Sequence, residues 1–146
     1  MGVPFTLKAM QPNTTTKTVS FWVPGGTRAA GVARRSALSV QVGLPGAIRH
    51  RLALLLSELV TNAIQHGGAG PHETVQVRLA SSPDRVRVEV FDPGSNGAAP
   101  TDRVEESGGF GLLLVDRLAD EWGRENTSSG GSLAWFELSL NHMRDN

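Results

Sequence analysis

Residues 47–66 carry the pattern that most constrains the fold of this chain. Their apolar side chains recur at spacings of three and four residues, which is the repeat of one face of an α-helix. Glycines and a proline within residues 67–71 end the pattern. A long helix with one apolar face has to pack against a second apolar surface, which the rest of the chain must provide. The stripe consists of Ile48, Leu52, Leu55, Leu59 and Ala63.

Two segments downstream of this helix provide such a surface. Apolar and polar side chains alternate along residues 75–79 and again along residues 86–90, on either side of a turn at residues 81–84. Alternation with a period of two predicts half-buried strands, and the short turn predicts an antiparallel hairpin. We therefore expect one face of the hairpin to be apolar and the other to be polar. The apolar positions are Val75, Val77, Leu79, Val86, Val88 and Val90.

The remaining segments predict further strands and helices. Strands are expected at residues 18–23, 122–126 and 132–140, and helices from Thr27 to about Val42 and over residues 109–119. Thr27 and Ser107 are the expected N-caps of the two helices. Antiparallel strands with helices between them predict an α+β fold: a two-layer α/β sandwich with a mostly antiparallel sheet and helices on one face.

The length of the chain fits a single domain. Its 146 residues can bury a core without a covalent staple. We expect an N-terminal arm over residues 1–17, the folded domain over residues 18–141 and a C-terminal tail over residues 142–146.

Composition excludes several classes of function. Lysine and arginine together number 14, as do aspartate and glutamate, so the formal net charge is zero. A general nucleic-acid binder needs a basic excess, and we expect no direct nucleic-acid contact. The absence of cysteine excludes disulfides, thiolate metal sites and a cysteine nucleophile. No apolar run reaches the roughly 20 residues of a membrane span, and no signal peptide is visible, so we expect a cytoplasmic protein without membrane contact.

Three polar residues on the long helix are candidates for chemistry. Glu58, Asn62 and His66 are spaced by four, which aligns them on one side of the helix. The side-chain oxygen of Asn62 is a hard ligand that suits Mg²⁺, and Glu58 can accept a proton from a hydroxyl group. The alternative is a solvated helix face with His66 capping its C-terminal end.

Two later segments can contribute to the same kind of site. Asp92 ends an apolar strand before Pro93 and Gly94, where its carboxylate can accept a hydrogen bond from an amino group such as that of adenine. Gly108, Gly109 and Gly111 lie at the start of a predicted helix, where backbone N–H groups can approach a phosphate. The alternatives are an Asx turn at Asp92 and a hinge at the glycines.

Taken together and in this order, the three segments resemble the Bergerat-fold ATPases, which include gyrase, the heat-shock chaperone of 90 kDa, histidine kinases and MutL. Residues 58–63 (ELVTNA) resemble the N box of that superfamily, residues 92–94 (DPG) its G1 box and residues 109–112 (GFGL) its G2 box. Within the superfamily, residues 57–63 with His66 and Gly67, and residues 111–115 with Leu118 to Asp120, are most similar to the stand-alone actinobacterial anti-sigma factor serine/threonine kinases.

The resemblance implies a role for each candidate residue. Asn62 would hold Mg²⁺ that bridges the phosphates of ATP, Glu58 would be the catalytic base, and Asp92 would accept the adenine amino group. Residues 93–107 would form a lid over the nucleotide. The implied ATP contacts are Asn62, His66, Asp92, Gly94, Gly97, Gly108, Gly109, Phe110, Gly111, Leu112 and Ser132.

The resemblance also implies protein partners. The partners would be a sigma factor, which the protein sequesters, and an anti-sigma factor antagonist, which it phosphorylates; a homodimer is a possible state.

The sequence departs from the superfamily pattern at two positions. Gly97 stands one residue further from Asp92 than the superfamily spacing, and Phe110 stands where related proteins often carry arginine. The alternatives are a nucleotide-gated protein-binding module with little or no kinase activity and a scaffold that binds no nucleotide.

Overall fold

The computed structural model describes residues 16–41, 43–66, 73–93, 109–128 and 130–140. The elements in these ranges follow the predicted order along the chain. They are β1 (Lys17–Pro24), α2 (Ala29–Val40), α3 (Gly46–His66), β2 (Thr74–Ser81), β3 (Arg85–Asp92), α5 (Gly109–Leu118), β4 (Glu121–Asn126) and β5 (Ser132–Ser139).

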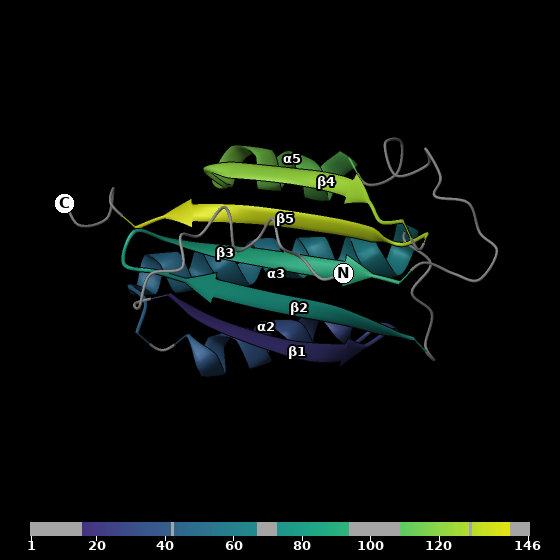
Figure 1. Ribbon diagram of the computed structural model, residues 1–146, viewed down its shortest axis with the longest axis horizontal. Coiled ribbons are helices and arrows are strands. Elements are labelled where there is room, and N and C mark those ends of the chain that lie inside the picture. Colours follow the sequence, from purple (N-terminus) through teal and green to yellow (C-terminus); the bar gives the residue numbers. More distant parts are fainter. Residues whose placement is uncertain (1–15, 42, 67–72, 94–108, 129, 141–146) are drawn as a thin grey trace.

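The strands form one five-stranded sheet in the order β1-β2-β3-β5-β4. Every neighbouring pair in the sheet is antiparallel. Figure 1 shows α2, α3 and α5 together behind the sheet, so the described part of the chain has two layers with the helices on one face. This arrangement confirms the predicted α+β sandwich. None of the helices in the described ranges is long and apolar enough to cross a membrane.

The core lies between the sheet and α3, as the two periodicities predict. Every residue of the apolar stripe on α3 is buried, and so are the inward-facing valines of β2 and β3. Phe136 and Leu138 of β5 and Val115 of α5 close the same cluster. Alanines at positions 29, 33 and 37 form the buried face of α2, so this helix can pack closely against its neighbours.

The ends of the elements differ slightly from the sequence expectations. Helix α2 begins at Ala29, with Arg28 rather than Thr27 at the N-cap and no side-chain cap bond. The helix ends at Val40, two residues early, and Arg49 of α3 donates hydrogen bonds to the carbonyls of Leu38 (3.0 Å) and Gln41 (3.0 Å) at this end. The orphan carbonyls of this helix end are therefore satisfied from the neighbouring helix. Ser107, the other expected N-cap, lies outside the described residues.

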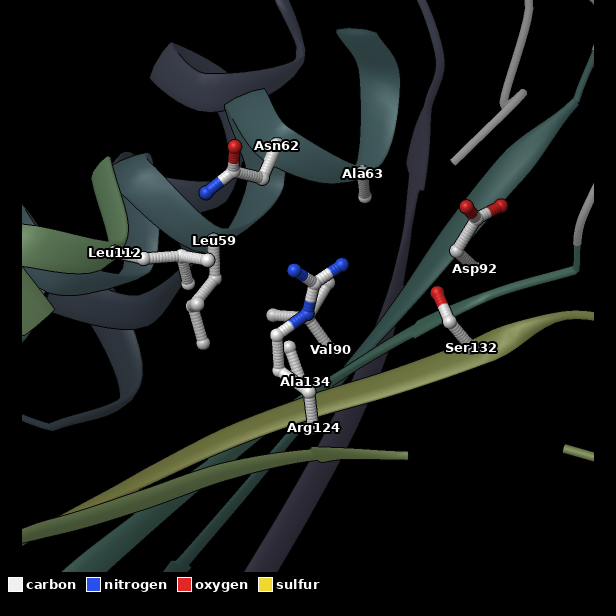
Figure 2. Close-up of a pocket in the computed structure, with 9 residues that line it drawn as sticks. All are labelled: Leu59, Asn62, Ala63, Val90, Asp92, Leu112, Arg124, Ser132 and Ala134. Atoms are coloured by element: carbon white, nitrogen blue, oxygen red, sulfur yellow. The ribbon is translucent and has the colours of Figure 1, made fainter. Parts of the chain in front are cut away.

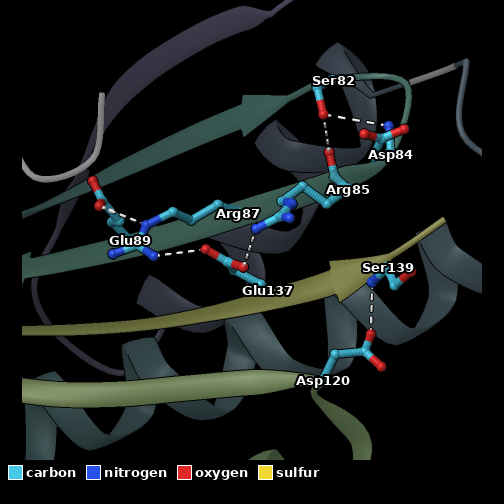
Figure 3. Close-up of polar contacts among 8 residues, drawn as sticks. All are labelled: Ser82, Asp84, Arg85, Arg87, Glu89, Asp120, Glu137 and Ser139. Carbon is cyan, nitrogen blue, oxygen red and sulfur yellow. Dashed lines mark hydrogen bonds and ion pairs between the residues drawn. The ribbon is translucent and has the colours of Figure 1, made fainter. Parts of the chain in front are cut away.

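Two polar side chains fix connections at one end of the sheet (Figure 3). Ser82 accepts a hydrogen bond from the backbone N–H of Asp84 (3.3 Å) in the turn between β2 and β3. Asp120 follows α5 and accepts a hydrogen bond from the backbone N–H of Ser139 on β5. This hydrogen bond connects the segment after α5 to β5, the second strand that follows it in the chain.

The sheet face opposite the helices is not the solvated polar face that the hairpin pattern predicts. Arg87 and Glu89 of β3 and Glu137 of β5 all point to this face, yet they are only 4%, 0% and 6% exposed. Arg87 donates to Glu89 through Nε (3.0 Å) and to Glu137 through Nη1 (2.8 Å), as Figure 3 shows. The charges can be buried here because each one is paired within the sheet. Arg78 and Arg85 extend the network at its edges.

The tryptophans occupy different environments. Trp135 lies between strands β3 and β4: the Arg87 guanidinium stacks 4.1 Å from its ring, and a Cβ on Gly123 would lie 2.7 Å from its Nε1. The ring explains why β4 carries a glycine in its interior. Trp122 packs at the edge of the core. Trp22 on β1 is 63% exposed.

Candidate functional site

Side chains from five elements meet in one hollow beneath the helix layer. Figure 2 shows the hollow between α3, α5 and the ends of β3, β5 and β4. Three of its polar residues, Asn62, Asp92 and Ser132, are predicted site residues, and so is the apolar residue Leu112. Tertiary folding therefore brings together residues that are 70 positions apart in sequence. The lining consists of Leu59, Asn62, Ala63, Val90, Asp92, Leu112, Arg124, Ser132 and Ala134.

Asn62 enters the hollow because of its place on α3. It lies next to the buried residues Leu59 and Ala63, which belong to the apolar stripe, so its side chain lies at the margin of the core. Its Nδ2 atom is buried and has no hydrogen-bond partner among the described residues. Such a group costs about 1–3 kcal/mol unless something else satisfies it. A buried polar group of this kind marks a place where a ligand can bind.

Asp92 and Ser132 are direct neighbours across the sheet. They are paired in the antiparallel register of β3 and β5, at the end of the sheet where both strands meet the hollow. The Asp92 side chain is buried, with 3% of the residue exposed. Gly131 precedes Ser132 and lies so close to the Asp92 backbone that a Cβ there would overlap the Asp92 carbonyl oxygen. The glycine thus lets β5 approach β3 closely enough to set Ser132 beside the carboxylate.

Arg124 is the polar lining residue that the sequence argument missed. Arg124 lies on β4, opposite Ala134 of β5, and points into the hollow, toward the space between Asn62 and Asp92 in Figure 2. The signal in the sequence was the alternation expected along a strand, in which residues two apart face the same side. Trp122 packs against the core, and Arg124, two residues further on, faces the same side. The small side chain of Ala134 leaves room for the guanidinium.

Glu58 does not line this hollow. It lies one helical turn before Asn62 on α3 and is half-buried, so it stands beside the hollow rather than in its wall. Its role stays a prediction.

The other predicted site residues fall at the edge of the described structure. His66 is the last residue of α3, and residues 109–111 form the first turn of α5, but their side chains are not described. Gly94, Gly97, Gly108 and the expected lid lie outside the described residues. The hollow bounded by the described side chains has a volume of about 20 Å³, which is room for one water molecule. Pockets for drug-sized ligands measure roughly 300–1,000 Å³, so the hollow between the described side chains is too small to hold a nucleotide by itself.

The family follows from a comparison with known protein families. Residues 24–136 match the family model of the histidine kinase-like ATPase domain. The chain belongs to this family. No curated protein matches this chain closely enough to be counted as a relative. The matched range begins at the end of β1 and ends within β5, so it includes every described element in whole or in part.

The described residues of this histidine kinase-like ATPase domain fit a magnesium nucleotide. The buried, unsatisfied amide of Asn62 can present its NH₂ group or, after a half-turn about Cβ–Cγ, its oxygen. The first would donate to a phosphate oxygen, and the second would bind Mg²⁺. Arg124 adds a positive charge to the same hollow, where it can meet the negative charge of a nucleotide.

Proposed function

We propose that this protein is an ATP-dependent serine/threonine kinase that acts as an anti-sigma factor. Its substrate would be a serine or threonine on an anti-sigma factor antagonist, and its second partner would be a sigma factor that it sequesters. The observation that carries the proposal is the buried Asn62 amide in one hollow with Asp92 and Ser132. The N box resemblance of residues 58–63 and the family membership support the kinase class.

Each residue would have a distinct task in the transfer. Asp92 would accept a hydrogen bond from the adenine amino group, and Asn62 would hold the metal at the phosphates. The antagonist hydroxyl oxygen would form a bond to the γ-phosphorus of ATP while the bond from that phosphorus to the β–γ bridging oxygen breaks. The hydroxyl proton would pass to the Glu58 carboxylate, and ADP would leave. Mg²⁺ would neutralise charge on the phosphates.

A nucleotide-gated binding module with little or no kinase activity is the second candidate. Phe110 in place of an arginine favours it, because a phosphate partner is then missing from the first turn of α5. Arg124 in the hollow weighs against this argument, since it offers a guanidinium from a different element. The choice between the two candidates depends on a measured phosphoryl transfer.

A transfer assay tests the proposal directly. The purified protein is incubated with ATP labelled at the γ-phosphate and with each anti-sigma factor antagonist of the source organism, and calorimetry measures ATP binding with and without Mg²⁺. We expect Mg²⁺-dependent binding and label on a serine or threonine of one antagonist. Binding without transfer to any antagonist favours the binding module. No binding at millimolar ATP contradicts both candidates and leaves the scaffold.

A further inference from the structure

The charge of this protein is unevenly distributed between the segment that contains α2 and α3 and the rest of the chain. The chain is neutral overall, but residues 28–66, which contain α2 and α3, carry five arginines and a single acidic residue, Glu58. The excess positive charge of the two helices is balanced by acidic residues elsewhere in the chain. A surface of one sign attracts partners of the opposite sign and steers their approach.

A second hollow lies between α2 and α3, on residues distinct from those of the nucleotide site. Its volume is about 390 Å³, and its apolar part includes Leu38, Ala53 and Leu54. Leu54 is 36% exposed, although the other leucines of α3 are buried. The polar part consists of Arg34, Arg49, His50 and Ser57, with Gly46 at one end, and none of the lining residues is acidic.

Arg34, which lines this hollow, contacts the neighbouring helix but is not neutralised by a carboxylate. Arg34 reaches across from α2 and donates to Ser57 Oγ of α3 (3.1 Å), and Ser57 donates in turn to the Ala53 carbonyl (2.8 Å). Arg35 is not part of the lining, but its guanidinium lies near that of Arg34: Arg34 Nη2 and Arg35 Nη1 are 3.8 and 3.3 Å from where a Cβ on Gly31 would be. No carboxylate pairs with either arginine within the described part of the chain. The positive charge of Arg34 in the hollow, with Arg35 beside it, favours an anionic partner.

We propose that this hollow, the α2–α3 groove, binds an acidic amphipathic helix of a partner protein. One large apolar side chain of that helix would rest on Leu38 and Leu54, and flanking carboxylates would pair with Arg34 and His50. Helices dock in apolar grooves by this combination of anchor and charge. A nucleic-acid backbone has no apolar anchor, so the exposed leucine favours a protein. The inference rests on the proposed role as a regulator that binds other proteins, but it requires no phosphoryl transfer.

A peptide selection tests the groove without nucleotide. A phage-displayed library of helical peptides of about 16 residues, long enough to hold helical structure, is selected on the wild-type protein and depleted on Arg34→Glu. We expect selected peptides with a large apolar residue and carboxylates three or four positions away. A selection that enriches no peptide, or peptides without carboxylates, overturns the proposal.

Matched variants then locate the binding by fluorescence anisotropy with one selected peptide. Arg34→Glu and Leu54→Asp should each weaken its affinity at least about tenfold, a change that reversing a contacting charge readily produces. Lys17→Glu changes the net charge equally at an exposed site on β1 and should leave the affinity within about twofold of wild type. Arg49 is not used, because it holds the end of α2. Unchanged melting temperatures show that the variants fold.

Three outcomes of these titrations contradict the groove. They are equal weakening by Lys17→Glu, no weakening by either groove variant, and tight binding of a single-stranded oligonucleotide that displaces the peptide. The last result would identify a nucleic-acid surface instead. The proposed kinase is tested separately by ATP binding and transfer, so its failure leaves peptide binding unaffected, and the reverse also holds.

Discussion

Gly131 lies against the backbone carbonyl of Asp92, in contact so close that no side chain fits between the two residues. The contact joins the start of β5 to the end of β3 and sets Ser132 beside Asp92. The fold and the candidate nucleotide site therefore depend on the same position. A glycine is needed here for its missing Cβ, because no left-handed backbone angle is involved.

Gly131→Ala tests this contact. The added methyl group must push β5 away from β3. We therefore expect the free energy of unfolding to fall by about 1–3 kcal/mol and ATP to bind more weakly. Urea unfolding and calorimetry measure the two effects. Gly43→Ala is the matched control, because a Cβ at Gly43 meets no atom within 4 Å. Equal stability of the two variants would show that the close contact does not constrain the sheet.

Asp92→Asn tests recognition of the base. The amide keeps an oxygen but loses the charge, and it can present NH₂ to the adenine amino group. We expect ATP affinity to fall by about 1–3 kcal/mol, the cost of one unsatisfied buried contact. The measurement compares ATP with GTP in wild type and variant. An equal loss for both nucleotides would indicate that Asp92 supports the fold rather than reads the base.

Glu58→Ala separates binding from chemistry. Glu58 stands outside the wall of the hollow, so its removal should leave ATP affinity within a few-fold of wild type. Transfer to the antagonist should fall by about 10²–10⁴, which is the usual contribution of a positioned base. Melting temperature, ATP titration and transfer rate are measured on the same preparation. If wild type transfers phosphate and the variant does so equally fast, Glu58 is not the base.

Arg87→Met tests the buried ion network on the outer face of the sheet. Removing the guanidinium leaves Glu89 and Glu137 buried without their shared partner, so we expect a loss of about 3–5 kcal/mol in unfolding free energy. Arg85→Met is the control, because Arg85 also pairs with Glu137 but its side chain is 41% exposed. Arg85→Met should lower the unfolding free energy by only about 0–1 kcal/mol. Similar losses for the two variants would contradict a special role for the buried pair.

Gly31→Ala should stabilise the protein. Gly31 lies inside α2, and a Cβ there meets only the ends of the Arg34 and Arg35 side chains, which can move aside. Alanine in a helix interior gains about 0.5–1 kcal/mol over glycine. Gly123→Ala makes the same change beneath the Trp135 ring and should lower stability. A lower denaturation midpoint for Gly31→Ala would show that the two arginines cannot adjust.

The helix layer and the hairpin could be predicted from the sequence, because their signals are local. The stripe from Ile48 to Ala63 repeats within single helical turns, and the valines of β2 and β3 alternate within single strands. All of these residues are buried where the periodicity places them. Asn62 could be chosen for the same reason, since its spacing from Glu58 fixes its side of α3.

The approach of distant residues could not be read from the sequence. Chain order alone does not put β5 between β3 and β4, yet only this strand order sets Ser132 beside Asp92 and turns Arg124 into the hollow. The same pairing buries Arg87 between Glu89 and Glu137, where the alternation along β3 predicts a solvent-exposed polar face. Local periodicity determined the elements and their inward faces. The tertiary structure decided which charges are buried and which polar groups share a site, because those depend on register between strands far apart in the chain.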